Sequence, residues 1–249
     1  ILKDIFSNIS IAKEFLNTDN TSIFGNSPTL NIDDEDNGFA YHLIKLVVNS
    51  IESLKIKNEK EFNFDLLNES FGHFVRDNFR NHIEDAQYMT PSEAVELMCN
   101  IALNDLEKED KTIRIQDFVI CDPCCGVGSF LSTFYKINKE NNVIDSSKLK
   151  IVGQDKVSRM VRLSKINMLL FNNHSHLITN GNSLAGESAI DNYKGKVDLI
   201  LTNPPFGAKF SSSELRPNAR NNYPLLHDLI LKNGSNFNSE VLFIDRCIS

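Results

Sequence analysis

An α/β fold with a doubly wound, mostly parallel sheet is predicted for residues 86–249 of this 249-residue chain. Short apolar runs alternate there with segments of helical periodicity, which implies parallel strands joined by right-handed crossovers. Polar residues follow the ends of the apolar runs at Asp122, Asp155, Asn182 and Asn203. Ligands of such sheets bind at the carboxyl ends of the strands. The pattern therefore predicts a Rossmann-like sheet with one shared site at that edge.

The predicted elements follow in chain order. Thr90-Pro91-Ser92-Glu93 is a capping box with proline at the first helical position, so a helix is expected to begin there. The four strands are expected at residues 117–122, 149–154, 176–181 and 197–202. Later helices are expected at residues 128–140, 156–171 and 240–245.

Residues 1–85 are expected to form a separate, helical N-terminal region. Helices are expected around residues 5–16, 39–54 and 64–79, with a polar loop at residues 17–38. This region holds 15 acidic and 8 basic residues, a net charge of −7, whereas residues 86–249 hold 18 of each. Because nucleic-acid binding requires phosphate neutralisation by Lys and Arg, the acidic region is not expected to grip nucleic acid.

Composition indicates an intracellular protein. No stretch approaches the ~20 apolar residues of a membrane span, and no secretory signal is visible. The odd number of cysteines, five, suggests reduced thiols in a cytosol. Adjacent Cys124 and Cys125 fit poorly with tetrahedral zinc spacing, and His174 and His176 are remote, so no metal site is expected.

A glycine-containing turn follows the strand at 117–122. Gly126 and Gly128 lie between that strand and a helix, where the absence of Cβ lets a ligand approach the backbone closely. Asp155 ends the next strand, at the position where an acid grips a ribose diol. No third glycine and no Gly-Lys-Ser/Thr phosphate loop follows. The pattern therefore favours a nucleoside ligand without a pyrophosphate.

A second motif, Asn203-Pro204-Pro205-Phe206, follows the apolar run at 197–202. The prolines fix φ and remove two backbone donors, so carbonyl groups can point outward as acceptors. The Asn203 amide offers another acceptor, and Phe206 offers a stacking face. These groups suit a planar, amino-bearing substrate. A strand that simply stops at two prolines is the alternative for the tetrapeptide alone.

These motifs resemble those of a known family. Residues 122–131 resemble the first motif of S-adenosylmethionine-dependent amino-methyltransferases, and residues 203–206 resemble their catalytic motif. Gln87-Tyr88-Met89-Thr90-Pro91 resembles the Q-x-x-T-P segment of adenine-N6 DNA methyltransferases, especially the modification (M) subunit of type I restriction-modification systems. Segments at 153–170 and 181–184 match the second and third motifs in order. The resemblance covers roughly residues 60–249.

The resemblance implies a methyltransferase fold, the cofactor S-adenosyl-L-methionine, and methyl transfer to N6 of an adenine flipped out of DNA. Asp122 would lie near the cofactor's amino group and Asp155 would accept its ribose hydroxyls. Asn182 would meet the adenine of the cofactor, although a plain turn residue is a strong alternative there. The implied catalytic residues are Asn203, Pro204, Pro205 and Phe206. The implied cofactor-binding residues are Thr90, Pro91, Asp122, Cys124, Gly126, Gly128, Asp155, Asn182 and Ser183.

The implied partners are DNA, a specificity (target-recognition) subunit and a restriction subunit, with no membrane, in a prokaryotic cytoplasm. In the resembled family the sheet continues beyond the fourth strand. The catalytic domain at 86–249 is therefore expected to be a truncated version, a fragment or one completed by association. Two alternatives stay open: a protein-glutamine or RNA amino-methyltransferase, and a catalytically incomplete assembly module.

Overall fold

The computed structural model describes part of the chain. The described residues are 2–16, 20–22, 24, 38, 41–42, 45–46, 49, 90–109, 117–171, 176–185, 188–211, 223–225 and 236–249. The chain divides into two compact units, residues 1–74 and residues 75–249. The expected boundary at 85/86 lies outside the described residues. Each unit is considered by itself.

The N-terminal unit begins with helix α1 (Leu2–Ser10), followed by the short 3-10 helix η1 (Lys13–Phe15). The ring of Phe24 packs against Phe6 and Phe15, with centroids 5.3 and 5.5 Å apart. Of the helix expected at 39–54, residues 41, 42, 45, 46 and 49 are described and helical. The helix expected at 64–79 lies outside the described residues.

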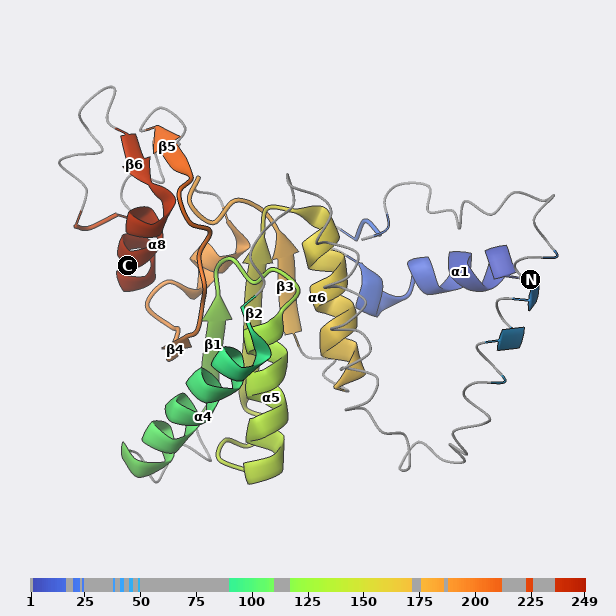
Figure 1. The fold of residues 1–249 in the computed structure, drawn as a ribbon, viewed down its shortest axis with the longest axis horizontal. Coiled ribbons are helices and arrows are strands. Elements are labelled where there is room, and N and C mark those ends of the chain that lie inside the picture. The colour runs from blue at the N-terminus through green and yellow to red at the C-terminus, as the bar shows by residue number, and fades with distance from the viewer. Residues whose placement is uncertain are drawn as a thin grey trace. The chain divides into compact units, whose positions relative to one another are not determined.

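The second unit contains a four-stranded parallel sheet, as the sequence predicts (Figure 1). Its strands run in the spatial order β3-β2-β1-β4. Their bounds are β1 Phe118–Asp122, β2 Leu149–Asp155, β3 His176–Asn180 and β4 Leu199–Ile200. The helices are α4 Ser92–Glu109, α5 Ser129–Asn141, α6 Ser158–Leu170 and α8 Ser239–Ile248, with the 3-10 helix η4 at Ala189–Tyr193.

The alternation of side chains along β1 separates two apolar layers. Phe118 and Ile120 belong to the main core, together with residues of α4, α5 and α6. Val119 and Cys121 point to the opposite face, where they pack with Ile190 of η4. Because successive residues of a strand face opposite sides, a five-residue apolar run buried throughout requires cover on both faces. The doubly wound arrangement is confirmed.

The order β3-β2-β1-β4 places a topological switch point between β1 and β4. The chain builds outward from β1 through β2 to β3 and then returns to the other side of β1. At such a point the loops that leave the two central strands diverge and open a crevice for a ligand. The two motifs predicted to be functional begin at Asp122 and at Asn203. They therefore follow these two neighbouring strands.

Two features differ from the sequence-based expectation. Strand β4 is two residues long rather than six. Next to it, Val119 N donates to the side chain of Asp198 at 2.8 Å instead of to a backbone carbonyl. The backbone N–H groups of Asp198 and Leu201 still donate to β1, but outside a regular ladder. A two-stranded antiparallel sheet, β5 (Lys209–Ser211) with β6 (Asn236–Asn238), was not expected at all. Each of its strands has only three residues, too few to show a period in the sequence.

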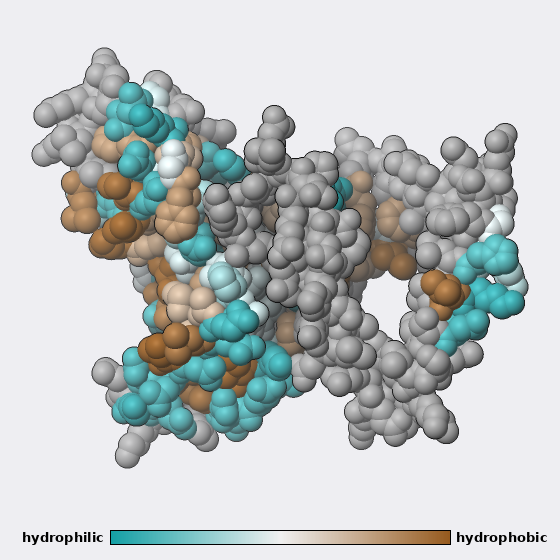
Figure 2. Space-filling view, viewed as in Figure 1, coloured by the Kyte–Doolittle hydropathy of each residue, from teal (hydrophilic) through white to brown (hydrophobic). Residues whose placement is uncertain are grey.

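Within the described residues, no helix is both long enough and apolar enough to cross a membrane. Figure 2 shows brown, hydrophobic surface over α4 and over α8. The exposed apolar residues of these helices are Leu97, Met98, Ile101, Val241, Ile244 and Ile248.

Gly128→Ala should destabilise the fold more than the same substitution at another glycine that has a positive φ but open space around it. Gly128 has φ +80°, and a Cβ there would lie 2.4 Å from Ser164 Oγ, a fully buried atom of α6. Gly195 has φ +67° but open space around its missing Cβ, so Gly195→Ala should cost only the conformational strain of about 1–2 kcal/mol. Chemical denaturation should give Gly128→Ala a larger loss, partly restored by Ser164→Ala. Equal losses for the two glycine variants would contradict the steric explanation.

Candidate active site

A cavity of about 210 Å³ opens at the carboxyl ends of the strands. Of the residues singled out from the sequence, all line it except Pro91 and Gly128. Gly128 instead packs on α6 beneath the turn, and Pro91 lies at the start of α4, where its carbonyl accepts from Ala94 and Val95. The fold thus brings together groups separated by more than 100 residues in the chain.

The carboxylate of Asp122 joins the two strands at the switch point. Its Oδ1 accepts from Cys124 N at 3.1 Å and from Thr202 Oγ1 at 2.7 Å. The Thr202 hydroxyl also lies 3.0 Å from Cys124 Sγ. Asp122 is 2% exposed, and this burial raises its pKa to about 7 against the lowering effect of both hydrogen bonds. Its charge is therefore poorly compensated, which suits a site that receives a cation.

Asp155 holds the glycine turn from the end of β2. Its Oδ2 accepts from Gly126 N at 3.0 Å and its Oδ1 accepts from Val157 N at 2.8 Å. Burial raises the pKa of Asp155, while these two bonds oppose the rise. A carboxylate has about four acceptor positions. Each oxygen can therefore still accept a hydroxyl proton from a ribose in the cavity.

Gly126 leaves space on the cavity wall. It has φ +53°, and a Cβ at this position would meet no atom within 4 Å. The missing Cβ is not needed for packing in the protein itself, in contrast to Gly128. An elongated ligand that passes over the turn would use this space. The glycine turn and Asp155 together fit a nucleoside-bearing cofactor.

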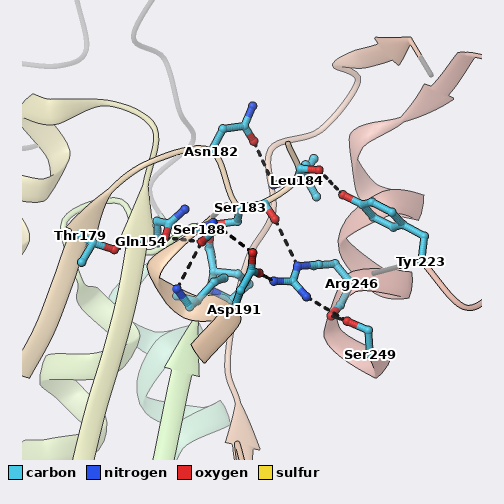
Figure 3. Close-up of polar contacts among 12 residues, drawn as sticks. Gln154, Thr179, Asn182, Ser183, Leu184, Ser188, Asp191, Tyr223, Arg246 and Ser249 are labelled. Atoms are coloured by element: carbon cyan, nitrogen blue, oxygen red, sulfur yellow. Dashed lines mark hydrogen bonds and ion pairs between the residues drawn. The ribbon is translucent and has the colours of Figure 1, made fainter. Parts of the chain in front are cut away.

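The side chain of Asn182 is engaged within its own loop (Figure 3), whereas that of Ser183 bonds the loop after β1. Asn182 Oδ1 accepts from Leu184 N at 3.0 Å, which is the turn geometry that the sequence left open as an alternative. Ser183 is 4% exposed, and its hydroxyl donates to Pro123 O. Asn182 Nδ2 is not used in that turn. The loop therefore offers an amide donor of Asn182 and its own backbone to a ligand.

The Asn-Pro-Pro-Phe turn is fixed at several atoms. Asn203 Nδ2 donates to Thr90 Oγ1 at 3.0 Å, a contact that spans 113 residues. Because the amide nitrogen is engaged, Oδ1 is the atom left to act as an acceptor. Ser239 Oγ donates to the carbonyl oxygen of Pro205 at 2.8 Å. Asn203 and Pro204 both line the cavity, and among the described residues Asn203 Oδ1 and the Pro204 carbonyl have no hydrogen-bond partner.

The expected capping box at the start of α4 has a different form. The Thr90 hydroxyl accepts from Asn203, and the carboxylate of Glu93 accepts from Ser92 Oγ at 3.3 Å. The sequence correctly indicated a helix start here, but the threonine side chain bonds the Asn-Pro-Pro-Phe turn. Phe206, the aromatic residue of that turn, is 67% exposed at the cavity rim.

Other cavity residues were not predicted from the sequence. Lys156 and Met160 follow Asp155, and the position of Lys156 next to the acid at a strand end was the one signal available. Further wall residues adjoin the two loops already described. The C-terminal part of the chain adds Ala208, Phe210, Ser239 and Phe243. Among the described residues, no cluster of three or more His, Cys, Asp or Glu side chains is placed to hold a metal ion.

The fold is that of the Rossmann-like methyltransferases. A modification subunit from Vibrio vulnificus, described as part of a type I restriction enzyme, superposes with a TM-score of 0.57 and 20% identity, covering 94% of this chain and 45% of that one.

The family model for N-6 DNA methylase matches residues 63–247. The chain therefore belongs to the N-6 DNA methylase family. Two relatives are the type II methyltransferase M.MamI of Microbacterium ammoniaphilum, 27% identical over 65% of this chain, and the type I restriction enzyme MjaVII methylase subunit of Methanocaldococcus jannaschii, 25% identical over 62%. The matched regions span 48% and 25% of the lengths of those two proteins.

Asp122→Asn should stabilise the cofactor-free protein above neutral pH. The pKa of Asp122 is raised to about 7, so the folded state binds this proton more tightly than the unfolded state, and the contribution to stability falls as pH rises through 7. The neutral amide keeps an acceptor for Cys124 N and Thr202. We expect a gain of about 1–3 kcal/mol at pH 8 that shrinks toward pH 5, measured by denaturation. A gain independent of pH would show that the buried charge is not the cause.

Proposed function

We propose that this protein transfers the methyl group of S-adenosylmethionine to N6 of an adenine flipped out of DNA, as the modification enzyme of a prokaryotic, cytoplasmic restriction-modification system. The observation that carries the proposal is that the cavity is lined by Asn203 and Pro204, whose Oδ1 and carbonyl oxygen would be the two acceptors. They lie in one cavity with the glycine turn and Asp155. Membership of the N-6 DNA methylase family supports it.

The cofactor would occupy the part of the cavity between the glycine turn and the loop of Asn182. When bound, it supplies an electrophilic sulfonium methyl group. Asp122 would attract its ammonium group and Asp155 would accept its ribose hydroxyls. The space over Gly126 would let the methionine part pass close to the backbone. Thr90, Cys124 and Ser183 would contribute cavity wall, while Pro91 and Gly128 support the site from outside the cavity.

The acceptor half would work mainly by positioning. The N6 lone pair of adenine is delocalised into the ring, so the nitrogen is a poor nucleophile. Accepting both of its N–H bonds at Asn203 Oδ1 and Pro204 O would favour a pyramidal nitrogen with its lone pair directed at the methyl carbon. N6 would take the methyl group as the bond from that carbon to sulfur breaks, and the extra proton on N6 would then leave to solvent. Preorganised acceptors stabilise the positive charge that develops on nitrogen.

Phe206 would provide the stacking surface for the flipped base. Its exposure at the cavity rim leaves the ring free to meet a base that has left the duplex, an extrusion that costs a few kcal/mol. DNA would be one partner. A specificity subunit and a restriction subunit are the others we propose, because two of the similar proteins are methylase or modification subunits of type I restriction enzymes.

The proposal is tested by transfer of tritiated methyl groups from S-adenosylmethionine. The purified native protein, alone and with a recognition subunit, is given unmethylated DNA, RNA and protein acceptors. Label on DNA, recovered as N6-methyladenine, is the expected result. Label recovered only on RNA or protein would assign a different acceptor. Cofactor binding without any transfer would indicate an assembly module.

Asn203→Ala should lower methyl transfer at least about 100-fold, because it removes one of the two preorganised acceptors. Binding of S-adenosylmethionine should survive, since Asn203 lies on the acceptor side of the cavity. Isothermal titration gives the affinity and single-turnover transfer gives the rate. Asn192→Ala, at an exposed asparagine outside the cavity, is the matched control. Retained activity in Asn203→Ala would overturn the assignment.

Affinity for S-adenosylmethionine should fall as pH is lowered from 7.5 to 5.5. In the cofactor-free protein the pKa of Asp122 is about 7, so protonation below that pH removes its attraction for the ammonium group. One linked proton gives a loss of up to about tenfold per pH unit. Titration calorimetry across this range measures it, and Asp122→Asn should flatten the profile. An unchanged slope in that variant would exclude Asp122 as the titrating group.

A further inference from the structure

Helix α8 contacts both halves of the cavity with one of its faces. Ser239, Phe243 and Arg246 are spaced at i, i+4 and i+7, which places them on the same side of the helix. Ser239 and Phe243 line the cavity, and Arg246 is 9% exposed. The opposite side carries the exposed residues Val241 and Ile244. The helix therefore has one side directed at the site and one directed away from it.

The first turn of α8 holds the Asn-Pro-Pro-Phe turn on both sides of its aromatic residue. The hydroxyl of Ser239, which is 2% exposed, donates to the Pro205 carbonyl at 2.8 Å. The carboxylate of Glu240 accepts from Gly207 N at 2.6 Å, and Gly207 has φ +75°. These bonds fix the peptide groups before and after Phe206. The Pro205 carbonyl is thereby engaged, while the Pro204 carbonyl has no hydrogen bond among the described residues.

The last turns of α8 hold the loop that contains Asn182 (Figure 3). Arg246 Nε donates to the Ser183 carbonyl at 3.2 Å, and its guanidinium forms an ion pair with Asp191. Asp191 also accepts from Ser188 N at 3.0 Å and so closes the start of η4. The backbone of the loop and the helix that follows it are thus tied to the same arginine.

Apolar packing keeps α8 in register with both contacts. Leu242 is fully buried and Phe243 is 6% exposed, and they form one cluster with Leu184 and Tyr223. A shift of the helix along its axis would break this cluster together with the bonds at its two ends. The distance between the acceptor turn and the cofactor loop is consequently set by one rigid element.

We propose that α8 is a brace that positions the methyl acceptor against the cofactor, with Ser239 and Glu240 as positioning residues for the acceptor turn and Arg246 as the positioning residue for the cofactor loop. This inference rests on the proposed function. The polar contacts of these three residues with the two loops go to backbone atoms, Pro205 O, Gly207 N and Ser183 O. They therefore determine the shape of the two loops rather than contacting substrate.

The brace predicts that changes at one end of α8 lower the transfer rate, whereas a change at the other end raises the Kd for S-adenosylmethionine. Ser239→Ala and Glu240→Ala should lower the single-turnover transfer rate about 10- to 100-fold, with the Kd for S-adenosylmethionine changed less than about threefold. Arg246→Ala should raise that Kd about tenfold, with a smaller effect on the rate at saturating cofactor. Glu240→Gln keeps an acceptor for Gly207 N and should recover most of the activity. Val241→Ala, on the exposed side of the same helix, should behave as wild type.

A role in stability alone would change the rate and the Kd together in the Ser239 and Arg246 variants, and that pattern would overturn the proposal. Equal losses in Glu240→Ala and Glu240→Gln would also overturn it, because they would assign the effect to helix charge. Hydrogen exchange of a peptide covering residues 203–208 gives a readout independent of transfer. Exchange should accelerate in Ser239→Ala and Glu240→Ala but not in Val241→Ala. Unchanged exchange refutes the brace, whereas absent transfer by wild-type protein refutes only the proposed function.

Discussion

The carboxylate of Asp122 is the constraint on which the site depends. It ends the central strand β1 and accepts hydrogen bonds from Cys124 N at the glycine turn and from Thr202, which lies two residues after β4 and 80 residues away in the chain. The sheet order makes these two strands neighbours, so their loops leave the sheet at the switch point and enclose one cavity. A buried, poorly compensated charge at this position destabilises the free protein and favours a cationic ligand, which links stability to cofactor binding.

Around Asp122 the cavity has two walls with different tasks. The glycine turn, Asp155 and the loop of Asn182 form the wall suited to a nucleoside cofactor. The Asn-Pro-Pro-Phe turn forms the wall suited to a planar amino group. In the proposed reaction the two walls act mainly by positioning. The rigid helix α8, joined to both walls, supplies that positioning in the brace proposal.

Much of the catalytic unit could be predicted from the sequence, because its signals are local. Apolar runs gave β1, β2 and β3 within one residue at each end, and the helices α5 and α6 within two. Strand β4 was placed correctly but is shorter, because the Asp198 side chain replaces part of the ladder. The strands β5 and β6 and the helix η4 were missed, since segments of three to five residues do not display a period and depend on the tertiary contacts that hold them.

The sequence by itself determined the chemistry available: the glycines, the acids at strand ends and the Asn-Pro-Pro-Phe turn, each readable because residue type and neighbours along the chain fix its local geometry. Tertiary structure alone decided how these groups are used. It paired Thr90 with the Asn203 amide and placed Ser239 behind Pro205. These two hydrogen bonds join residues that are 113 and 34 positions apart in the chain. Such bonds leave no pattern in one sequence, because they depend on where the folded sheet brings the loops together.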